Sequence, residues 1–233
     1  VMIGRGDLGI EIGAENLPMV QKMIISKCNK VGKPVITATH MLESMIKSAV
    51  PTRAEVSDIA NAILDGTDAI MLSEETTLGD YPVESVEMMT RIALRVEKEY
   101  PHTKVFDLLP MQRGTTDAVT AAVVATAKDI GAKLIVAATT TGHTARKVSR
   151  FKPQLPILAI TPSERTRNQL LLSFGVYPLK AKKFETIPAL MKFIREYVLE
   201  KKLASKGDKV VIATGFPFNK PSLSTNTLLV ETI

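Results

Sequence analysis

Apolar residues fall into two kinds of block along the first hundred positions. Short apolar runs begin near Met2, Val35 and Ala69, and each turns polar within a few residues, which is typical of buried parallel strands. After each run, apolar residues recur at steps of three and four, which indicates an amphipathic helix. They are Leu17, Val20, Ile24, Cys28 and Val31, then Val56, Ile59 and Ile63, then Val86, Met89, Ala93 and Val96.

Local signals mark the ends of these helices. Gly32 is suited to end the first helix, and Thr52 and Glu55 have the spacing of a capping box at the start of the second. Pro82 suits the first turn of the third. Cys28 lies on the apolar side of the first helix, so we expect it to be part of the core.

One strand and one helix therefore recur every 33 or 34 residues. This period fits a (β/α)8 barrel, in which about 250 residues divide among eight units of about 31 each. Three units cannot close a barrel. The pattern leaves two interpretations open, because residues 1–100 could form an open parallel sheet or the C-terminal part of a barrel.

Residues 101–115 show little periodicity and contain two prolines and a glycine, which predicts a linker. Beyond it, residues 116–233 alternate between helical patterns, the first at 121–130, and short apolar runs. This alternation predicts a parallel sheet covered by helices on both faces, a three-layer α/β/α domain. The predicted strands are 133–139, 156–161, 175–179 and 208–214, with 225–233 as an antiparallel edge strand.

The two parts differ in charge. Residues 1–98 have 10 Lys and Arg against 14 acidic residues, a net charge of −4, whereas residues 99–233 have 20 against 10, a net charge of +10. A basic half can indicate nucleic-acid binding, but aromatic residues make up only 5% of the chain and tryptophan is absent. We therefore expect no nucleic-acid partner and favour small anionic ligands.

Two further properties concern location. No run of about 18 uncharged apolar residues occurs, and the first residues lack the pattern of a signal peptide, so we expect a soluble, unexported protein without a membrane partner. The single cysteine, Cys28, agrees with the reducing cytoplasm.

Polar side chains end all three strands of the first part. One polar strand end usually forms a turn or caps a helix. Three in succession are typical of a barrel, in which the carboxyl ends of the strands meet at the face that carries the active site. The three ends read Gly4-Arg5-Gly6-Asp7, Thr37-Ala38-Thr39-His40 and Leu72-Ser73-Glu74-Glu75-Thr76.

A threonine-rich segment follows the first strand of the second part. Residues 139–145 read TTTGHTA and precede Arg146 and Lys147 of a predicted helix. Hydroxyls, a glycine and free amides at a helix start can hold an anion. The same pattern also caps helices without any ligand, and the residues alone leave both possibilities open.

Two stretches resemble a known family. PVITATHMLESMIKSAVPTRAEVSDIANAILDGTDAIMLSEET (34–76) resembles the signature region of pyruvate kinases, and GRGDLGIEI (4–12) resembles the strand end that precedes it there. The resemblance is continuous over residues 1–98 and looser beyond. It implies an α/β fold with a partial TIM (β/α)8 barrel over residues 1–100, then the linker and a three-layer α/β/α C-terminal domain over residues 116–233.

The resemblance also implies an activity. Pyruvate kinases transfer a phosphoryl group from phosphoenolpyruvate to ADP, which gives pyruvate and ATP in glycolysis. Such enzymes use Mg²⁺ or Mn²⁺ together with K⁺, act in the cytoplasm as homotetramers, and can respond to a phosphorylated effector.

Roles for individual residues follow from the same resemblance. Asp7 matches the metal carboxylate, and the amides around Gly6 and Asp7 match the site of the substrate carboxylate. Thr39 matches the threonine that orients the substrate and lies on the route of proton delivery, with Ser73 and Glu75 as members of a relay. The effector-phosphate loop is matched by Thr139, Thr140, Thr141, Gly142, His143 and Thr144, with residues 215–222 as a second wall.

The chain departs from the family pattern at two positions. Glu74 stands where the family has glycine, so we expect backbone strain there if the glycine needs a positive φ. His40 stands where the family has glutamine, and we expect it to be a pocket residue rather than a base or a metal ligand. Glu43 and Arg53 are expected to have structural roles.

The family's catalytic lysine and second metal carboxylate match no residue of this chain. We therefore expect a fragment that is inactive alone. The alternative is a non-catalytic module that binds a phosphate effector and retains part of a barrel.

Overall fold

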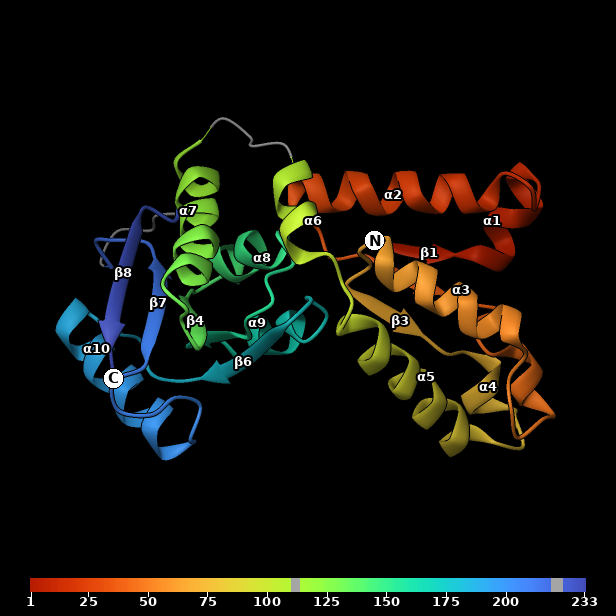
Figure 1. Ribbon diagram of the computed structural model, residues 1–233. Coiled ribbons are helices and arrows are strands. Elements are labelled where there is room, and N and C mark those ends of the chain that lie inside the picture. The colour runs from red at the N-terminus through yellow and green to blue at the C-terminus, as the bar shows by residue number, and fades with distance from the viewer. Residues whose placement is uncertain (110–113, 219–223) are drawn as a thin grey trace. The chain divides into compact units, whose positions relative to one another are not determined.

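The computed structural model describes residues 1–109, 114–218 and 224–233. The chain forms two compact units, Val1–Pro101 and His102–Ile233 (Figure 1).

Three short strands form the sheet of the first unit. The strands β1 (Met2–Gly4), β2 (Ile36–Ala38) and β3 (Ala69–Met71) are parallel and adjacent in that order. They lie where the apolar runs predicted them. The helices that follow them are α1 (Arg5–Ile12), α2 (Leu17–Val31), the 3-10 helix η1 (Glu43–Ile46), α3 (Arg53–Leu64), α4 (Glu74–Thr77) and α5 (Pro82–Glu97).

The helix signals of the first unit are confirmed. Gly32 ends α2 in the left-handed conformation, with φ 73°. Both hydrogen bonds of the Thr52–Glu55 capping box are present at the start of α3. Cys28 is 6% exposed and packs in a cluster with Ile25, as expected of a core residue.

The second unit is built on a five-stranded sheet. Its strand order is β6-β5-β4-β7-β8, parallel except for the antiparallel edge strand β8. The predicted direction of β8 is therefore correct. The strands are β4 (Leu134–Ala138), β5 (Ile157–Thr161), β6 (Val176–Lys180), β7 (Lys209–Thr214) and β8 (Thr227–Thr232), and the helices are α6 (His102–Leu108), α7 (Thr115–Asp129), α8 (His143–Ser149), α9 (Glu164–Leu170) and α10 (Ile187–Glu200).

Alternate residues of this sheet enter two different cores. Ile135 and Ala137 pack with residues of α7 and α8, whereas Leu134 and Val136 pack with residues of α10. Because successive strand residues point to opposite faces, the sheet is covered on both sides. Figure 1 shows α7 and α10 on either side of β7. The three-layer α/β/α arrangement is confirmed.

Three elements differ from the pattern-based expectation. Helix α1 follows β1 without a break, although Gly6 and Gly9 and the lack of apolar periodicity gave no helix signal. Helix α6 lies within the predicted linker, of which residues 110–113 are outside the described residues. Helix α7 begins at Thr115, six residues before the apolar pattern indicated.

Candidate active site and effector cavity

The three strands of the first unit end at the same level. Gly4 pairs with Ala38, and Ala38 pairs with Met71, so the residues that follow each strand emerge along one edge of the sheet. Asp7, Thr39 and Ser73 all belong to these following segments. The structure thus brings together three strand ends that lie far apart in the sequence.

The Thr39 hydroxyl lies against the end of β1. Its Oγ1 accepts a hydrogen bond from the Gly6 amide at 2.9 Å and donates one to the Ala38 carbonyl at 2.7 Å. The structure therefore places Gly6 and Thr39 in direct contact. A substrate carboxylate bound to the Gly6 amide would have to share or replace the bond to Thr39.

Packing within the chain does not require glycine at position 6. A Cβ built there would lie 3.5 Å from His40 Cε1, an ordinary contact distance. The exposed His40 side chain therefore lies next to Gly6, and its expected role as a pocket residue stays a prediction. Without a side chain at Gly6, a ligand could approach its amide closely, although the amide already donates to Thr39 Oγ1 at 2.9 Å.

Asp7 is the candidate metal ligand. It is exposed in the first turn of α1, one residue after Gly6. Within the described ranges, no group of three or more His, Cys, Asp or Glu side chains is arranged to hold a metal ion. Mg²⁺ binds several hard oxygen ligands, and one carboxylate can be one of them. Asp7 could therefore supply one ligand of a Mg²⁺ site.

Glu75 ties the second and third strand ends together. Its side chain is 2% exposed, and it accepts hydrogen bonds from the amides of Leu42 at 3.0 Å and Ser73 at 2.7 Å. Among the described residues, no hydrogen bond joins Glu75 to Thr39 or to the Ser73 hydroxyl. The relay through Ser73 and Glu75 stays a prediction. The observed hydrogen bonds of Glu75 hold the backbone at Leu42 and Ser73.

The strain expected at Glu74 is not found. Glu74 is the first residue of α4 and is not one of the non-glycine residues with positive φ. Helical backbone accepts glutamate there. Positive φ occurs instead at Thr39 and His40, for which the sequence gave no signal.

Glu55 links the start of α3 to η1. Its carboxylate accepts hydrogen bonds from the Ser44 amide at 2.7 Å, the Ser44 hydroxyl at 2.6 Å and the Thr52 amide at 2.7 Å. Burial alone would raise the pKa of Glu55, but the hydrogen bonds from Ser44 and Thr52 outweigh burial and hold the pKa below its ordinary value.

Two other residues of this region were expected to have structural roles. Glu43 is exposed in η1, and Arg53 is exposed as the first residue of α3.

The lowered pKa of Glu55 predicts a pH-dependent stability. A depressed folded-state pKa gives stability that is present above the unfolded-state pKa and lost as the pH falls through the folded-state pKa. We expect Glu55→Gln to lower the unfolding free energy by about 1–2 kcal/mol at pH 7 and by less at pH 3. Urea unfolding at both pH values measures the difference, with Glu87→Gln on the exposed side of α5 as the control. An equal loss of unfolding free energy at pH 7 and pH 3 would contradict a stabilising role for the ionised Glu55 carboxylate.

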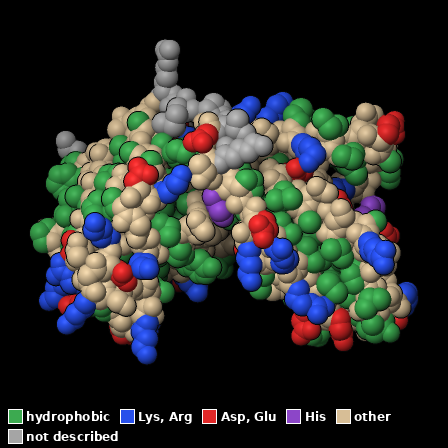
Figure 2. All heavy atoms as spheres, viewed as in Figure 1, with side chains coloured by type: hydrophobic (Ala, Val, Ile, Leu, Met, Phe, Trp, Pro, Cys, Tyr) green, Lys and Arg blue, Asp and Glu red, His purple; other side chains and the backbone are tan. Residues whose placement is uncertain are grey.

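The threonine loop of the second unit borders a cavity of about 110 Å³. Thr139, Thr140, Thr141, His143 and Thr144 line it. Lys182 and Lys183 line it as well, so the cavity has two cationic side chains as well as hydroxyls. Figure 2 shows lysine and arginine side chains spread over the visible surface of this unit.

Backbone geometry explains the glycine of this loop. Gly142 has φ +80°, a conformation that favours glycine, and a Cβ there would also come within 3.1 Å of the Leu170 side chain. The Gly142 amide donates a hydrogen bond to Thr139 Oγ1 at 3.0 Å, and the hydroxyls of Thr144 and Thr225 are bonded at 2.8 Å. The loop is therefore held in shape by its own hydroxyl groups.

Two positive charges and one negative charge surround His143. Burial lowers the pKa of His143, and the positive charges of Lys147 and Arg146 lower it further. Neither Lys147 nor Arg146 lines the cavity itself, and Lys147 pairs with Asp117 at 3.2 Å. Of the predicted second wall, Gly215, Pro217 and Phe218 line the cavity, whereas residues 219–222 lie outside the described residues.

None of the helices in the described ranges combines the length and the apolar character that crossing a bilayer requires.

Comparison with known proteins gives the same family for both units. Residues 1–86 match the family model "Pyruvate kinase, barrel domain", and residues 117–231 match "Pyruvate kinase, alpha/beta domain". The first match decides between the two interpretations of the first unit, because its three β/α units correspond to part of a barrel. Neither match favours a stand-alone effector module.

Individual relatives agree. The chain is 46% identical over 238 residues to a pyruvate kinase of Clostridium acetobutylicum, covering 100% of this chain and 50% of that protein. It is 44% identical over 240 residues to a pyruvate kinase of Dictyostelium discoideum, covering 100% of this chain and 47% of that protein.

A solved structure supports the fold at the level of coordinates. The pyruvate kinase of Cryptosporidium parvum superposes with a TM-score of 0.91 and 36% identity, over 99% of this chain and 46% of that one. The chain spans about half the length of the curated relatives it matches. It belongs to the pyruvate kinase family, of which it carries three units of the barrel domain and the α/β domain.

Proposed function

We propose that this chain is part of a pyruvate kinase, which transfers the phosphoryl group of phosphoenolpyruvate to ADP and protonates the resulting enolate to pyruvate. The observation that carries the proposal is the contact of Gly6 with Thr39 at the carboxyl ends of adjacent parallel strands, in a chain of this family. Asp7 follows Gly6 directly, so a carboxylate, the backbone amides of a helix start and a hydroxyl lie near one strand edge.

Each of these groups has a separate part in the proposed reaction. The amides of Gly6 and Asp7 bind the carboxylate of phosphoenolpyruvate. Asp7 would hold Mg²⁺ or Mn²⁺, which neutralises charge on the transferred phosphoryl group when bound. The phosphorus–oxygen bond to the substrate breaks as a bond to an oxygen of the ADP β-phosphate forms, which leaves an enolate.

Thr39 then acts on that enolate. Its hydroxyl delivers a proton to the methylene carbon, and the proton is replaced through groups behind it, for which Ser73 and Glu75 are the candidates. A hydroxyl is a weak acid, which suits delivery to a strongly basic carbanion.

The activity is tested with the longest natural polypeptide that contains residues 1–233, called the whole enzyme below. Incubation with phosphoenolpyruvate, ADP and MgCl₂ should produce pyruvate and ATP in equal amounts. Phosphorus NMR follows the formation of ATP, and proton NMR follows the methyl group of pyruvate. Residues 1–233 alone should bind the phosphorylated effector but should not convert phosphoenolpyruvate to pyruvate. Effector binding without any turnover by the whole enzyme would overturn the proposal and favour the non-catalytic module.

The cavity behind the threonine loop is proposed as the site of a phosphorylated effector. Hydroxyls of Thr139, Thr140 and Thr141 and the two lysines Lys182 and Lys183 give hydrogen-bond donors and positive charge around a space large enough for a phosphate group. Sugar bisphosphates, sugar monophosphates and nucleotides all carry such a group.

Three further properties remain predictions from the family resemblance. They are the homotetramer, the K⁺ requirement and the cytoplasmic location.

Placing a negative charge in this cavity should weaken effector binding. Thr141→Glu is expected to weaken binding of fructose bisphosphate, ribose phosphate or AMP at least about 30-fold, because the carboxylate repels the phosphate. Calorimetric titration of the chain measures this. Thr115→Glu, which adds the same charge at the start of α7, is the control. If no ligand gives heat with the unmodified chain at low salt, the loop only caps α8.

A further inference from the structure

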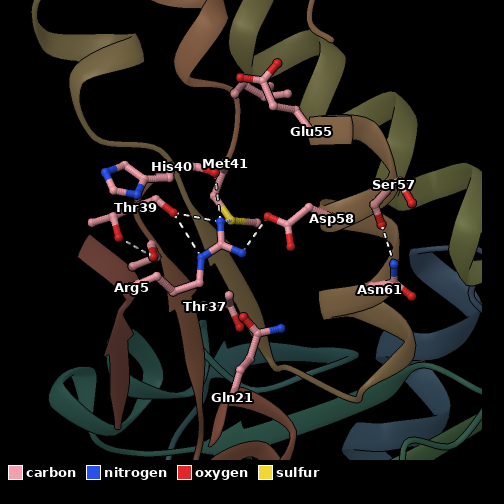
Figure 3. A network of polar contacts seen from close by, with 12 residues as sticks. Arg5, Gln21, Thr37, Thr39, His40, Met41, Glu55, Ser57, Asp58 and Asn61 are labelled. Atoms are coloured by element: carbon pink, nitrogen blue, oxygen red, sulfur yellow. Dashed lines mark hydrogen bonds and ion pairs between the residues drawn. The ribbon is translucent and has the colours of Figure 1, made fainter. Parts of the chain in front are cut away.

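A buried arginine lies directly behind the proposed active site. Arg5 is 6% exposed, although it begins a helix at the end of β1. Its Nε and Nη2 donate hydrogen bonds to the Thr39 carbonyl at 3.1 and 2.7 Å, and Nη2 also donates to the His40 carbonyl at 2.9 Å. Figure 3 shows the guanidinium pointing at this pair of carbonyls. Arg5 therefore binds the backbone of two consecutive residues.

Those two residues have an unfavourable backbone conformation. Thr39 has φ 65° and His40 has φ 51°, in the left-handed region that non-glycine residues rarely adopt. Such residues persist only where surrounding contacts hold them. The hydrogen bonds from Arg5 are contacts of this kind, because they engage both carbonyls of the strained pair.

Asp58 fixes the other side of the guanidinium. Arg5 Nη1 lies 2.5 Å from Asp58 Oδ2, and Asp58 comes from the middle of α3. The planar guanidinium is thus bonded along both edges, to carbonyls on one side and to a carboxylate on the other. A lysine could keep the charge but could not span these acceptors, because its donors radiate from one nitrogen.

The bonded arrangement sets the position of the Thr39 hydroxyl. Thr39 Oγ1 accepts from the Gly6 amide and donates to the Ala38 carbonyl, and its direction depends on the left-handed backbone of Thr39. Arg5 is also the residue before Gly6. One side chain therefore joins the segment that carries the candidate substrate amide to the segment that carries the candidate proton donor.

We propose that Arg5 and Asp58 are positioning residues, which hold the left-handed Thr39–His40 turn so that the Thr39 hydroxyl can protonate the enolate. The inference rests on the proposed function for its catalytic part. Its structural part, the dependence of the Gly6–Thr39 contact on Arg5, stands without it.

Two variants of the whole enzyme test the catalytic part. Arg5→Lys keeps the charge without the planar donors, and Asp58→Asn keeps the shape without the charge. Both should lower kcat about 10- to 100-fold, since small displacements of a reacting group have effects of this size. KM for phosphoenolpyruvate should change less than about 3-fold. The solvent deuterium isotope effect on kcat should rise, because proton delivery becomes slower.

Lys22→Met is the matched control. It breaks the ion pair between Lys22 of α2 and Asp65 at the C-terminal end of α3. Neither residue makes a hydrogen bond to Arg5, Gly6 or Thr39. This variant should lose stability while kcat per folded molecule and the isotope effect stay as in the unmodified enzyme. If Arg5→Lys behaves like Lys22→Met, the pair is only structural and the proposal is wrong. If Arg5→Lys fails to fold, Asp58→Asn decides in the same way.

Hydrogen exchange separates this proposal from the proposed function. In the 233-residue chain, the Gly6 amide should exchange at least about 10-fold faster in Arg5→Lys than in Lys22→Met, because its bond to Thr39 is lost. Unchanged Gly6 exchange in Arg5→Lys would overturn the positioning role even if the enzyme is active. Absence of turnover in the unmodified whole enzyme would instead refute the proposed function and leave the exchange result to decide the structural part.

Discussion

Replacing Asp7 by asparagine is expected to lower turnover of the whole enzyme by about 10²- to 10³-fold, which corresponds to several kcal/mol of lost charge stabilisation. Asp7 is exposed in the first turn of α1 and directly follows Gly6. Asparagine has the same shape but no negative charge, and Mg²⁺ prefers carboxylate oxygen over a neutral amide. The fold should be unaffected, because Asp7 makes no hydrogen bond to another described side chain.

The measurement is turnover against MgCl₂ concentration. Asp7→Asn should require a much higher concentration for half-maximal rate, as well as showing a lower maximum. Asp80→Asn is the control, since Asp80 is an exposed carboxylate of the same unit that pairs with Lys47 at 3.3 Å. An Asp7→Asn enzyme with the Mg²⁺ dependence of the unmodified enzyme would show that Asp7 is not a metal ligand.

Elements with a strong local signal were predictable from the sequence. The positions of β1, β2 and β3 follow from short apolar runs, although these runs are only partly buried in this unit, and the start of α3 follows from a capping box whose two bonds need only four consecutive residues. The alternation of Ile135 and Val136 between two cores likewise reflects a two-residue period that a strand imposes.

Elements set by distant contacts were not predictable. Helix α1 contains Gly6 and Gly9, which weaken helix propensity, and its position follows from β1 and α2 rather than from its own sequence. The left-handed turn at Thr39 and His40 has no glycine or asparagine to mark it. Its support comes from Arg5, which lies 34 residues earlier in the chain.

The candidate site shows the same division. Asp7, Thr39 and Ser73 became candidates because each follows a predicted strand, whose carboxyl end parallel neighbours bring to one edge, and because the family resemblance implies a role for each. Arg5 and Asp58 were missed, since they are separated by 53 residues and Asp58 lies within a helix with no strand end near it in the sequence. The available signal was Arg5 itself, a long charged side chain between two glycines at the end of a buried strand.

Removing the Thr39 hydroxyl should slow enolate protonation without preventing substrate binding. Proton transfer by a positioned group contributes about 10²- to 10⁴-fold to rate. We therefore expect Thr39→Ala to lower kcat of the whole enzyme about 100-fold and to change KM for phosphoenolpyruvate less than about 3-fold. The Gly6 amide, which donates to Thr39 Oγ1 at 2.9 Å, becomes more available to the substrate carboxylate, so binding is not expected to weaken strongly.

The order of chemical steps gives a sharper measurement. ATP forms before the enolate is protonated, so Thr39→Ala should release a rapid burst of about one ATP per active site, followed by slow turnover. Rapid-quench sampling detects the burst. Thr39→Ser retains the hydroxyl and should show neither the burst nor a loss of kcat beyond about 10-fold. Equal losses in the alanine and serine variants, without a burst in either, would mean that Thr39 shapes the strand end and that the proton comes from another group.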